Sequence, residues 1–379
     1  MAKIGSFAVA LLAFALAGAA AAQPIKIYGL VELSGTGATS GTNFDNGVKL
    51  AVKEINASGG ILGRQVEYTS ADTQSNPQTA KALAQRAVDS GAYVVMGPVF
   101  SGSIMVSMAE TKKAEIPNFT GGEAASITQQ GNPYIFRTSF TQTTAMPKVA
   151  RYIANDLKAK NVAIIWVNND FGKGGRDTMV KELEKFGVKV VADISTDPGQ
   201  VDFSGAVLKA KQANADALFV YSNEEESARA LRELRKQGYD KPIVGETVLT
   251  SQKVIELAGD AANGAVAHVG LTADAPQPAI KAFDDKFQKE YKSKGDHNAL
   301  KGYSGMYMVK VLTEKLGKTD PKAFAAAMHG AKFSVKDNPG VLLDVTFDNN
   351  GDLDRESFMT KVVNGKQQVI ATLPPASAK

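Results

Sequence analysis

The sequence predicts an α/β protein with two lobes, each a doubly wound parallel sheet with helices on both faces. Three observations support this fold class. The chain has 379 residues, enough for about two domains of ordinary size. Short β-branched and aromatic runs alternate with amphipathic helical patterns, which is typical of βαβ units and a parallel sheet. The same alternation starts again near Thr144, which indicates a second sheet with its own core.

The first lobe is predicted from residue 25 onward. Helical stripes separate the strands, and the Ser58-Gly59-Gly60 stop and the Asn76-Pro77 start are typical of helix ends. The expected strands are residues 25–30, 66–70 and 93–97, and the expected helices are residues 44–55, 76–88 and 103–113.

The same alternation of strands and helices predicts the second lobe, and it changes in the C-terminal part of the chain. Helices near 279–291, 303–316 and 320–329 have few strands between them, so we expect them to return to the first lobe. Residues 341–347 and 357–363, around the turn 348–352, predict a terminal hairpin. The second-lobe elements are helices at 144–157, after 171–172, from about 204 and around 228–234, and strands at 162–167, 188–194 and 217–221.

Residues 1–22 have the features of a secretory signal peptide. Lys3 precedes an apolar stretch from Phe7 to Gly18, and small residues follow up to Ala22. The apolar run is too short for a membrane-spanning helix and has no charged stop. We expect cleavage after Ala22, which leaves a mature chain that begins at Gln23.

Composition excludes several classes of protein and site. The chain has no cysteine, so it has no lipid-anchoring cysteine, no disulfide and no thiolate metal site. We therefore expect an unlipidated protein in the periplasm. The net charge is +4, and loss of Lys3 leaves 4 − 1 = +3, with lysines interleaved among acids. This pattern is typical of a solvated surface and argues against a nucleic-acid-binding protein.

One turn has the chemistry of an anion site. The segment from Gly97 to Ser103 joins the carboxyl end of a strand to the start of a helix. Free N–H groups of the first helical turn, together with the hydroxyls of Ser101 and Ser103, suit a carboxylate. Ligands of open α/β sheets also collect at this edge. The alternative is that Ser101 or Ser103 is only the N-cap of the helix.

Other motifs favour structural interpretations. The glycine-rich loop 35–41, which includes Ser40, spaces its third glycine wrongly for a dinucleotide fingerprint and is either ligand-facing or flexible. The acids at 224–226 predict a solvated helix start. The cluster Asp348, Asp352 and Asp354 lacks calcium-loop spacing and indicates a turn. Histidines are scattered at 268, 297 and 329, so we expect no metal, no cofactor and no catalytic triad.

Motifs along the whole mature sequence resemble those of one family. They are Ile25-Lys26-Ile27-Tyr28-Gly29 with Leu33-Ser34-Gly35, the stretch 47–64, Asp72 with Asn76-Pro77, Gly97-Pro98 with Ser101, Phe136-Arg137-Thr138, Asp170-Phe171-Gly172, Asp202-Phe203-Ser204 and Gly351-Asp352. The chain resembles the periplasmic leucine/isoleucine/valine-binding protein family, the type I solute-binding proteins of ABC importers. The resemblance implies two lobes joined by a three-segment hinge that closes on the ligand.

The resemblance implies lobe boundaries near Gln142, Leu271 and Leu343. Lobe 1 is then residues 23–142 with 272–343, and lobe 2 is residues 143–271 with 344–379. It also implies a monomer that binds a small carboxylate ligand, with an inner-membrane ABC permease as its partner.

The resemblance also carries a ligand site onto this sequence. The carboxylate site falls on Ser101 and the following amides of Gly102 and Ser103. A second donor position falls within residues 121–126, where the counterpart of the family's threonine is close to Ala124, so backbone amides, or Ser126 after a one-residue slip, would serve. The implied site residues are Ser40, Phe100, Ser101, Gly102, Ser103, Gly122, Glu123, Ala124, Phe171, Asn223, Glu246, Thr247 and Tyr303. Phe100, Phe171 and Tyr303 are expected to form the apolar wall.

The ammonium side of this site decides the ligand class. The family's acidic residue corresponds to Thr247, with Glu246 beside it. Because threonine cannot neutralise a buried charge, an amino acid of branched-chain type requires Glu246 or Glu123 to reach its ammonium group. Otherwise a carboxylate without ammonium, such as an aromatic acid, fits better. A receptor's sensing lobe and a secreted hydrolase are the other classes, and the chain has no nucleophile elbow for an enzyme.

Overall fold

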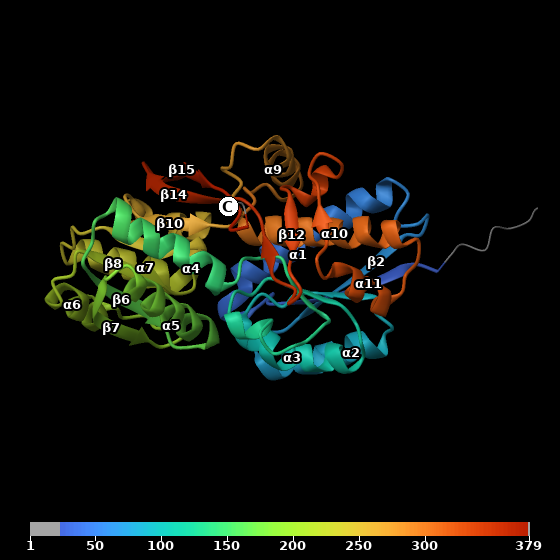
Figure 1. Cartoon of the computed structure of the whole chain (residues 1–379), viewed down its shortest axis with the longest axis horizontal. Helices are drawn as coiled ribbons and strands as arrows, with labels where there is room; N and C mark the ends of the chain where they lie inside the picture. The colour runs from blue at the N-terminus through green and yellow to red at the C-terminus, as the bar shows by residue number, and fades with distance from the viewer. Residues whose placement is uncertain (1–22, 378–379) are drawn as a thin grey trace, which may run out of the picture.

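The computed structural model describes residues 23–377 and has two lobes side by side along its long axis (Figure 1). Each lobe has its own sheet and its own buried apolar clusters, so the predicted two-lobed α/β fold is confirmed. The predicted signal peptide lies outside the described residues. Within the described part of the chain, no helix is long and apolar enough to cross a membrane.

The first lobe is built on a parallel sheet of short strands. Its strands are β1 (Ile25–Val31), β2 (Val66–Asp72), β3 (Val94–Met96), β4 (Asn118–Thr120) and β5 (Ile135–Arg137). They lie in the order β2-β1-β3-β4-β5, and every neighbouring pair is parallel. The carboxyl ends of all five strands therefore meet at one edge, which is where ligands collect in such sheets.

Helices from both ends of the sequence cover this sheet, as Figure 1 shows in blue, cyan and orange. They are α1 (Ala38–Ala57), α2 (Pro77–Asp89), α3 (Ser101–Lys113), α9 (Pro278–Tyr291), α10 (His297–Leu316) and α11 (Pro321–Met328). The C-terminal helices return to the first lobe, as predicted, and α10 packs along α1.

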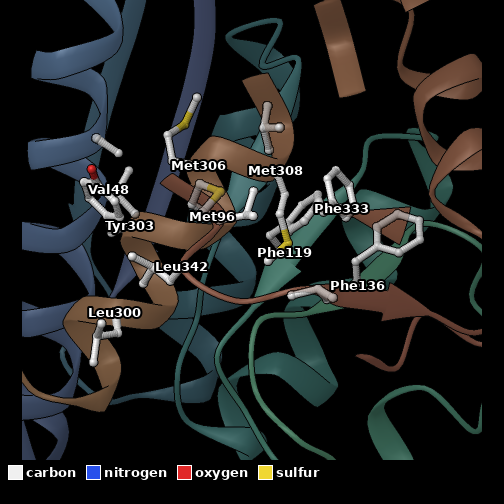
Figure 2. Packing of buried hydrophobic residues seen from close by; sticks show 14 of the residues in the cluster. Val48, Met96, Phe119, Phe136, Leu300, Tyr303, Met306, Met308, Phe333 and Leu342 are labelled. Atoms are coloured by element: carbon white, nitrogen blue, oxygen red, sulfur yellow. The ribbon is translucent and has the colours of Figure 1, made fainter. Parts of the chain in front are cut away.

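Two glycines allow α1 and α10 to approach closely. A Cβ at Gly47 would lie 2.0 Å from the carbonyl oxygen of Ala299, and one at Gly302 would lie 2.1 Å from that of Phe44. The buried core beside this contact includes Val48 of α1 and side chains of α10 such as Leu300 and Met306 (Figure 2). This packing fixes the first turn of α10 relative to α1.

The second lobe has a larger sheet. Its strands are β6 (Asn161–Val167), β7 (Lys189–Thr196), β8 (Ala217–Tyr221), β9 (Ile243–Glu246), β10 (Val266–Val269), β14 (Ser357–Val363) and β15 (Lys366–Leu373). The order is β15-β14-β10-β9-β8-β6-β7, with β6 to β10 parallel and the last two strands antiparallel.

The helices of the second lobe cover both faces of this sheet (Figure 1). They are α4 (Gln142–Arg151), continued by a π-helical turn (Tyr152–Asp156), α5 (Asp170–Lys185), α6 (Ser204–Gln212), α7 (Glu224–Lys236) and α8 (Gln252–Ala258). Short 3₁₀ turns in the two lobes are Gly35–Gly37, Ala125–Ile127, Thr247–Thr250, Gly259–Ala262 and Pro339–Val341.

The predicted terminal hairpin is wrong. The turn 348–352 joins β12 (Val345–Phe347) to β13 (Leu353–Asp354), and β12 also pairs with β11 (Lys332–Phe333). Residues 357–363 instead form β14, which pairs with β10 and β15 in the other lobe.

This correction moves the third passage between the lobes. The chain passes between β5 and α4, between β10 and α9, and between β13 and β14. The third passage was expected near Leu343, with residues 344–379 in the second lobe. Val345, Phe347 and Leu353 are instead buried in the core of the first lobe, because their apolar side chains alternate toward it.

Candidate functional site

A cavity of about 440 Å³ lies between the lobes, at the carboxyl ends of strands from both sheets. Its volume is typical of a pocket for a small molecule. The first lobe contributes the β3–α3 turn, the loop after β4, and the first turns of α1 and α10. The second lobe contributes the β6–α5 and β8–α7 turns. The cavity is lined by nine of the predicted site residues: Ser40, Phe100, Ser101, Gly102, Ser103, Gly122, Glu123, Phe171 and Asn223.

The start of α3 has free hydrogen-bond donors. Phe100 is the N-cap residue and no side chain caps the helix, so the N-cap alternative for Ser101 and Ser103 is wrong. The backbone N–H groups of residues 101–103 have no hydrogen-bond partner within residues 23–377. The Ser101 hydroxyl accepts a hydrogen bond from the N–H of Ala124 (3.3 Å), which leaves its own proton free to donate. The free donors of this turn therefore have the geometry of an anion-binding site.

The buried carboxylate of Glu32 fixes the position of this turn through two hydrogen bonds. Glu32 follows β1, and its two carboxylate oxygens accept the N–H groups of Val99 and Phe100, each at 3.1 Å. Burial raises the pKa of Glu32 to about 7, against the lowering effect of these two hydrogen bonds. Glu32 was not among the predicted site residues, although its place at the end of a parallel strand was a usable signal.

Glu123 lies between the two lobes at the wall of the cavity. Lys301 of α10 donates to Glu123 Oε1 at 3.0 Å, and the hydroxyl of Tyr221 donates to Oε2 at 3.4 Å. Burial raises the pKa of Glu123 to about 7, and the nearby carboxylate of Glu246 adds to this effect. Lys301 is itself a buried lining residue and was not among the predicted site residues.

Glu224 makes a hydrogen bond across the cleft. The hydroxyl of Ser40, on α1 of the first lobe, donates to Glu224 Oε1 at 2.6 Å. Glu224 is only 5% exposed and lines the cavity, and Glu226 is buried too, so the predicted solvated helix start is wrong at both positions and holds only for exposed Glu225. Glu224 forms no salt bridge within residues 23–377, and burial raises its pKa.

Several predicted site residues do not line this cavity. Glu246 is buried and accepts from the hydroxyl of Thr247, while His268 lies 3.2 Å away. Thr247 lines a separate small cavity. The N–H of Ala124 is engaged by Ser101. One Glu246 oxygen is engaged within the second lobe, and Glu246 does not line the cavity, so the expected ammonium contact through this residue has no support in the cavity's lining.

The apolar wall differs from the prediction at one residue. Phe100 and Phe171 line the cavity, together with Val99 and Val248. The ring of Phe171 stacks on Tyr221 with 4.2 Å between centroids, which fixes its face toward the cleft. Tyr303 was expected in this wall, but it lies in the core of the first lobe (Figure 2), where its hydroxyl donates to Glu54.

Comparisons with known proteins extend over nearly the whole chain. A family model described as periplasmic binding protein matches residues 24–367. The leucine-, isoleucine-, valine-, threonine- and alanine-binding protein of Pseudomonas aeruginosa is 28% identical over 351 residues, which cover 91% of this chain and 92% of that protein.

Solved structures share the fold. A branched-chain amino acid transporter substrate binding protein of Streptococcus pneumoniae, in complex with isoleucine, is 27% identical with a TM-score of 0.82, and the match covers 93% of this chain and 99% of that chain. A solute binding protein of an ABC transporter from Rhodopseudomonas palustris, in complex with 3,4-dihydroxybenzoic acid, is 24% identical with a TM-score of 0.84 and coverage of 93% and 97%.

Proposed function

The chain belongs to the periplasmic binding protein family, and on that basis we propose that it is the extracytoplasmic solute-binding component of an ABC transporter. It binds an amino acid in the cleft through the carboxylate and delivers it to an inner-membrane permease. The relatives named above support the transport role. The signal-peptide pattern of residues 1–22 supports a periplasmic location.

The observation that carries the amino-acid assignment is the buried carboxyl group of Glu224, which lines the cavity and has no salt bridge within residues 23–377. A buried carboxylate without a counter-charge is costly, and a ligand ammonium group would remove that cost. The donors at the start of α3 lie on the opposite lobe and line the same cavity. An anion site on one lobe and a carboxylate on the other match the two ends of an amino acid.

Glu224 suits the ammonium role better than Glu123. Glu123 already has Lys301 at 3.0 Å, so its charge is compensated within the protein. Glu224 has no salt bridge within residues 23–377; the neutral hydroxyl of Ser40 donates to it, and Lys301 is a more distant positive charge. A ligand that contacts α3 and Glu224 together would hold the two lobes closed.

An aromatic acid is the second candidate. Phe100 and Phe171 offer two aromatic surfaces to the cavity, and the Rhodopseudomonas palustris protein with the same fold was solved with 3,4-dihydroxybenzoic acid. Such a ligand would use the α3 site and leave Glu224 unpaired.

Isothermal titration calorimetry separates these candidates. We expect leucine or glutamine to bind, and 4-methylpentanoate, which is leucine without its amino group, to bind at least tenfold more weakly. Glu224→Gln should remove this difference, because an amide cannot neutralise the ammonium group. Glu225→Gln is the matched control, since Glu225 is exposed on the same helix turn and pairs with Arg229.

Ser101→Ala tests the carboxylate end of the same assignment. Loss of one charge-assisted hydrogen bond should weaken binding by about 1.5–3 kcal/mol. If benzoate and 4-methylpentanoate bind wild type as tightly as every amino acid, the second candidate is favoured. If no carboxylate binds at all, the proposed function is wrong.

A further inference from the structure

The first turn of α10 presents three polar side chains to the cavity. His297, Asn298 and Lys301 all line it, and all are buried. The helix start does not need them, because Asp296 is the N-cap and accepts the N–H groups of Asn298 and Ala299, each at 2.9 Å. A wall of this kind is unsuited to a purely aliphatic side chain.

Asn298 is the most informative of the three. It is 1% exposed, and neither its amide nitrogen nor its amide oxygen has a hydrogen-bond partner within residues 23–377. Other buried polar atoms without partners, such as those of Gln142, Glu246 and His268, belong to residues that do not line the cavity. A buried amide without partners is unfavourable, so such a group calls for an explanation.

The charges around this wall restrict the partner. Lys301 is paired with Glu123, and Glu224 adds a second carboxylate to the cavity. Burial, with a smaller contribution from Lys301, lowers the pKa of His297 well below its usual range, so the ring is neutral. A neutral imidazole and an amide each offer one kind of donor and one kind of acceptor. A second carboxylate on the ligand would find the cation of this wall, Lys301, already paired with Glu123.

We infer that the ligand's side chain ends in an uncharged hydrogen-bonding group, with a carboxamide as the best match, and that Asn298 and His297 bind it. This inference rests on the proposed function, since it concerns the side chain of the proposed amino acid. A carboxamide presents an oxygen to the Asn298 amide nitrogen and an N–H to its oxygen, so both atoms gain partners. Asn298 then sets specificity for polar over aliphatic amino acids.

Calorimetry with three amino acids of similar size tests this. Wild type should bind glutamine at least tenfold more tightly than leucine, which lacks the polar group, and more tightly than glutamate, which adds a charge. Asn298→Leu should lower the glutamine-to-leucine preference at least tenfold, because the wall becomes apolar. His297→Phe should lower it as well. Lys315→Leu, at the exposed far end of α10, is the control.

The outcomes separate this inference from the proposed function. Leucine bound as tightly as glutamine by wild type would overturn the inference and leave the proposed function intact. An unchanged preference in Asn298→Leu would overturn the role of Asn298. If none of the three amino acids binds, both the inference and the proposed amino-acid function are wrong. Thermal unfolding of each variant checks that it folds. If the Asn298→Leu variant does not fold, Asn298→Ala takes its place in the comparison.

Discussion

Glu32 illustrates how a single buried residue shapes the site. Its carboxylate accepts two backbone N–H groups of the turn that leads into α3, so it fixes the position of the proposed anion site. The same burial raises its pKa from 4.5 to about 7. Between these two values the folded protein retains a proton that the unfolded chain releases. The folded state is therefore stabilised below about pH 4.5, and this contribution is lost as pH rises through 7.

We predict that Glu32→Gln reduces the pH dependence of stability. In wild type, the free energy of unfolding should lose on the order of 3 kcal/mol from Glu32 between about pH 4.5 and about pH 8, because each pKa unit corresponds to about 1.4 kcal/mol. Glutamine does not titrate, so the variant should lack this loss. Urea denaturation of both proteins at the two pH values measures it. Glu123 and Asp296, whose pKa values are also raised, are present in both proteins and cancel in the comparison.

At this scale the sequence predicted the local part of the site. Ser101 could be placed because a strand end followed by a helix start is visible in the sequence. Glu224 and Asn298 could not be identified, because their burial depends on the opposite lobe and on the packing of α1 against α10. Tyr303 was misplaced for the same reason, since that packing turns it into the core.

At the scale of elements, one arginine ties three segments together. Arg137 ends β5 and is fully buried. Its guanidinium donates to the carbonyl oxygens of Gly122 (2.7 Å) and Ala124 (2.6 Å) in the loop that lines the cavity. It also pairs with Asp352 of the turn between β12 and β13 (2.5 Å). The loop beside the cavity is therefore held by a residue that does not line the cavity.

We predict that Arg137→Met lowers the free energy of unfolding by about 3–5 kcal/mol, because Asp352 loses its counter-charge and two buried carbonyl groups each lose a hydrogen bond. Ligand binding should weaken as the 121–124 loop loses its support. Arg229→Met is the matched control, since Arg229 pairs with exposed Glu225 one helix turn away and should cost less than about 1 kcal/mol. Urea denaturation and calorimetry measure both effects. Equal losses in the two variants would contradict the role of Arg137.

The sequence predicted long elements well and short ones poorly. Helices such as α1, α2, α5 and α7 have an apolar stripe, whereas β4 and β5 have three residues each, too few for a periodic pattern. The prediction of a terminal hairpin was wrong for another reason. A turn such as 348–352 fixes a reversal of the chain, but the strand that pairs beyond it is chosen by tertiary packing.

At the scale of the whole molecule, contacts across the cleft define a closed form. Ser40 donates to Glu224, and Tyr221 donates to Glu123, each pair joining the two lobes. Gly102 at the start of α3 faces α5, and a Cβ there would lie 3.3 Å from Asp170 Oδ2. The chain crosses from one lobe to the other in three passages. Rotation about these passages would separate the cross-lobe pairs without disturbing either core.

We predict that ligand binding shifts the molecule from an open form to this closed form. Small-angle X-ray scattering should give a smaller radius of gyration with saturating leucine or glutamine than without it, because the ligand bridges both lobes. Gly102→Trp should prevent this compaction, since a large side chain would collide with α5 on closure. Gly205→Trp is the matched control: Gly205 is also the second residue of a helix that begins with Ser-Gly, and a Cβ there has no neighbour within 4 Å. If wild type keeps one radius with and without ligand, hinge closure is excluded. If Gly205→Trp also abolishes compaction, the effect of Gly102→Trp reflects general damage rather than a wedge between the lobes.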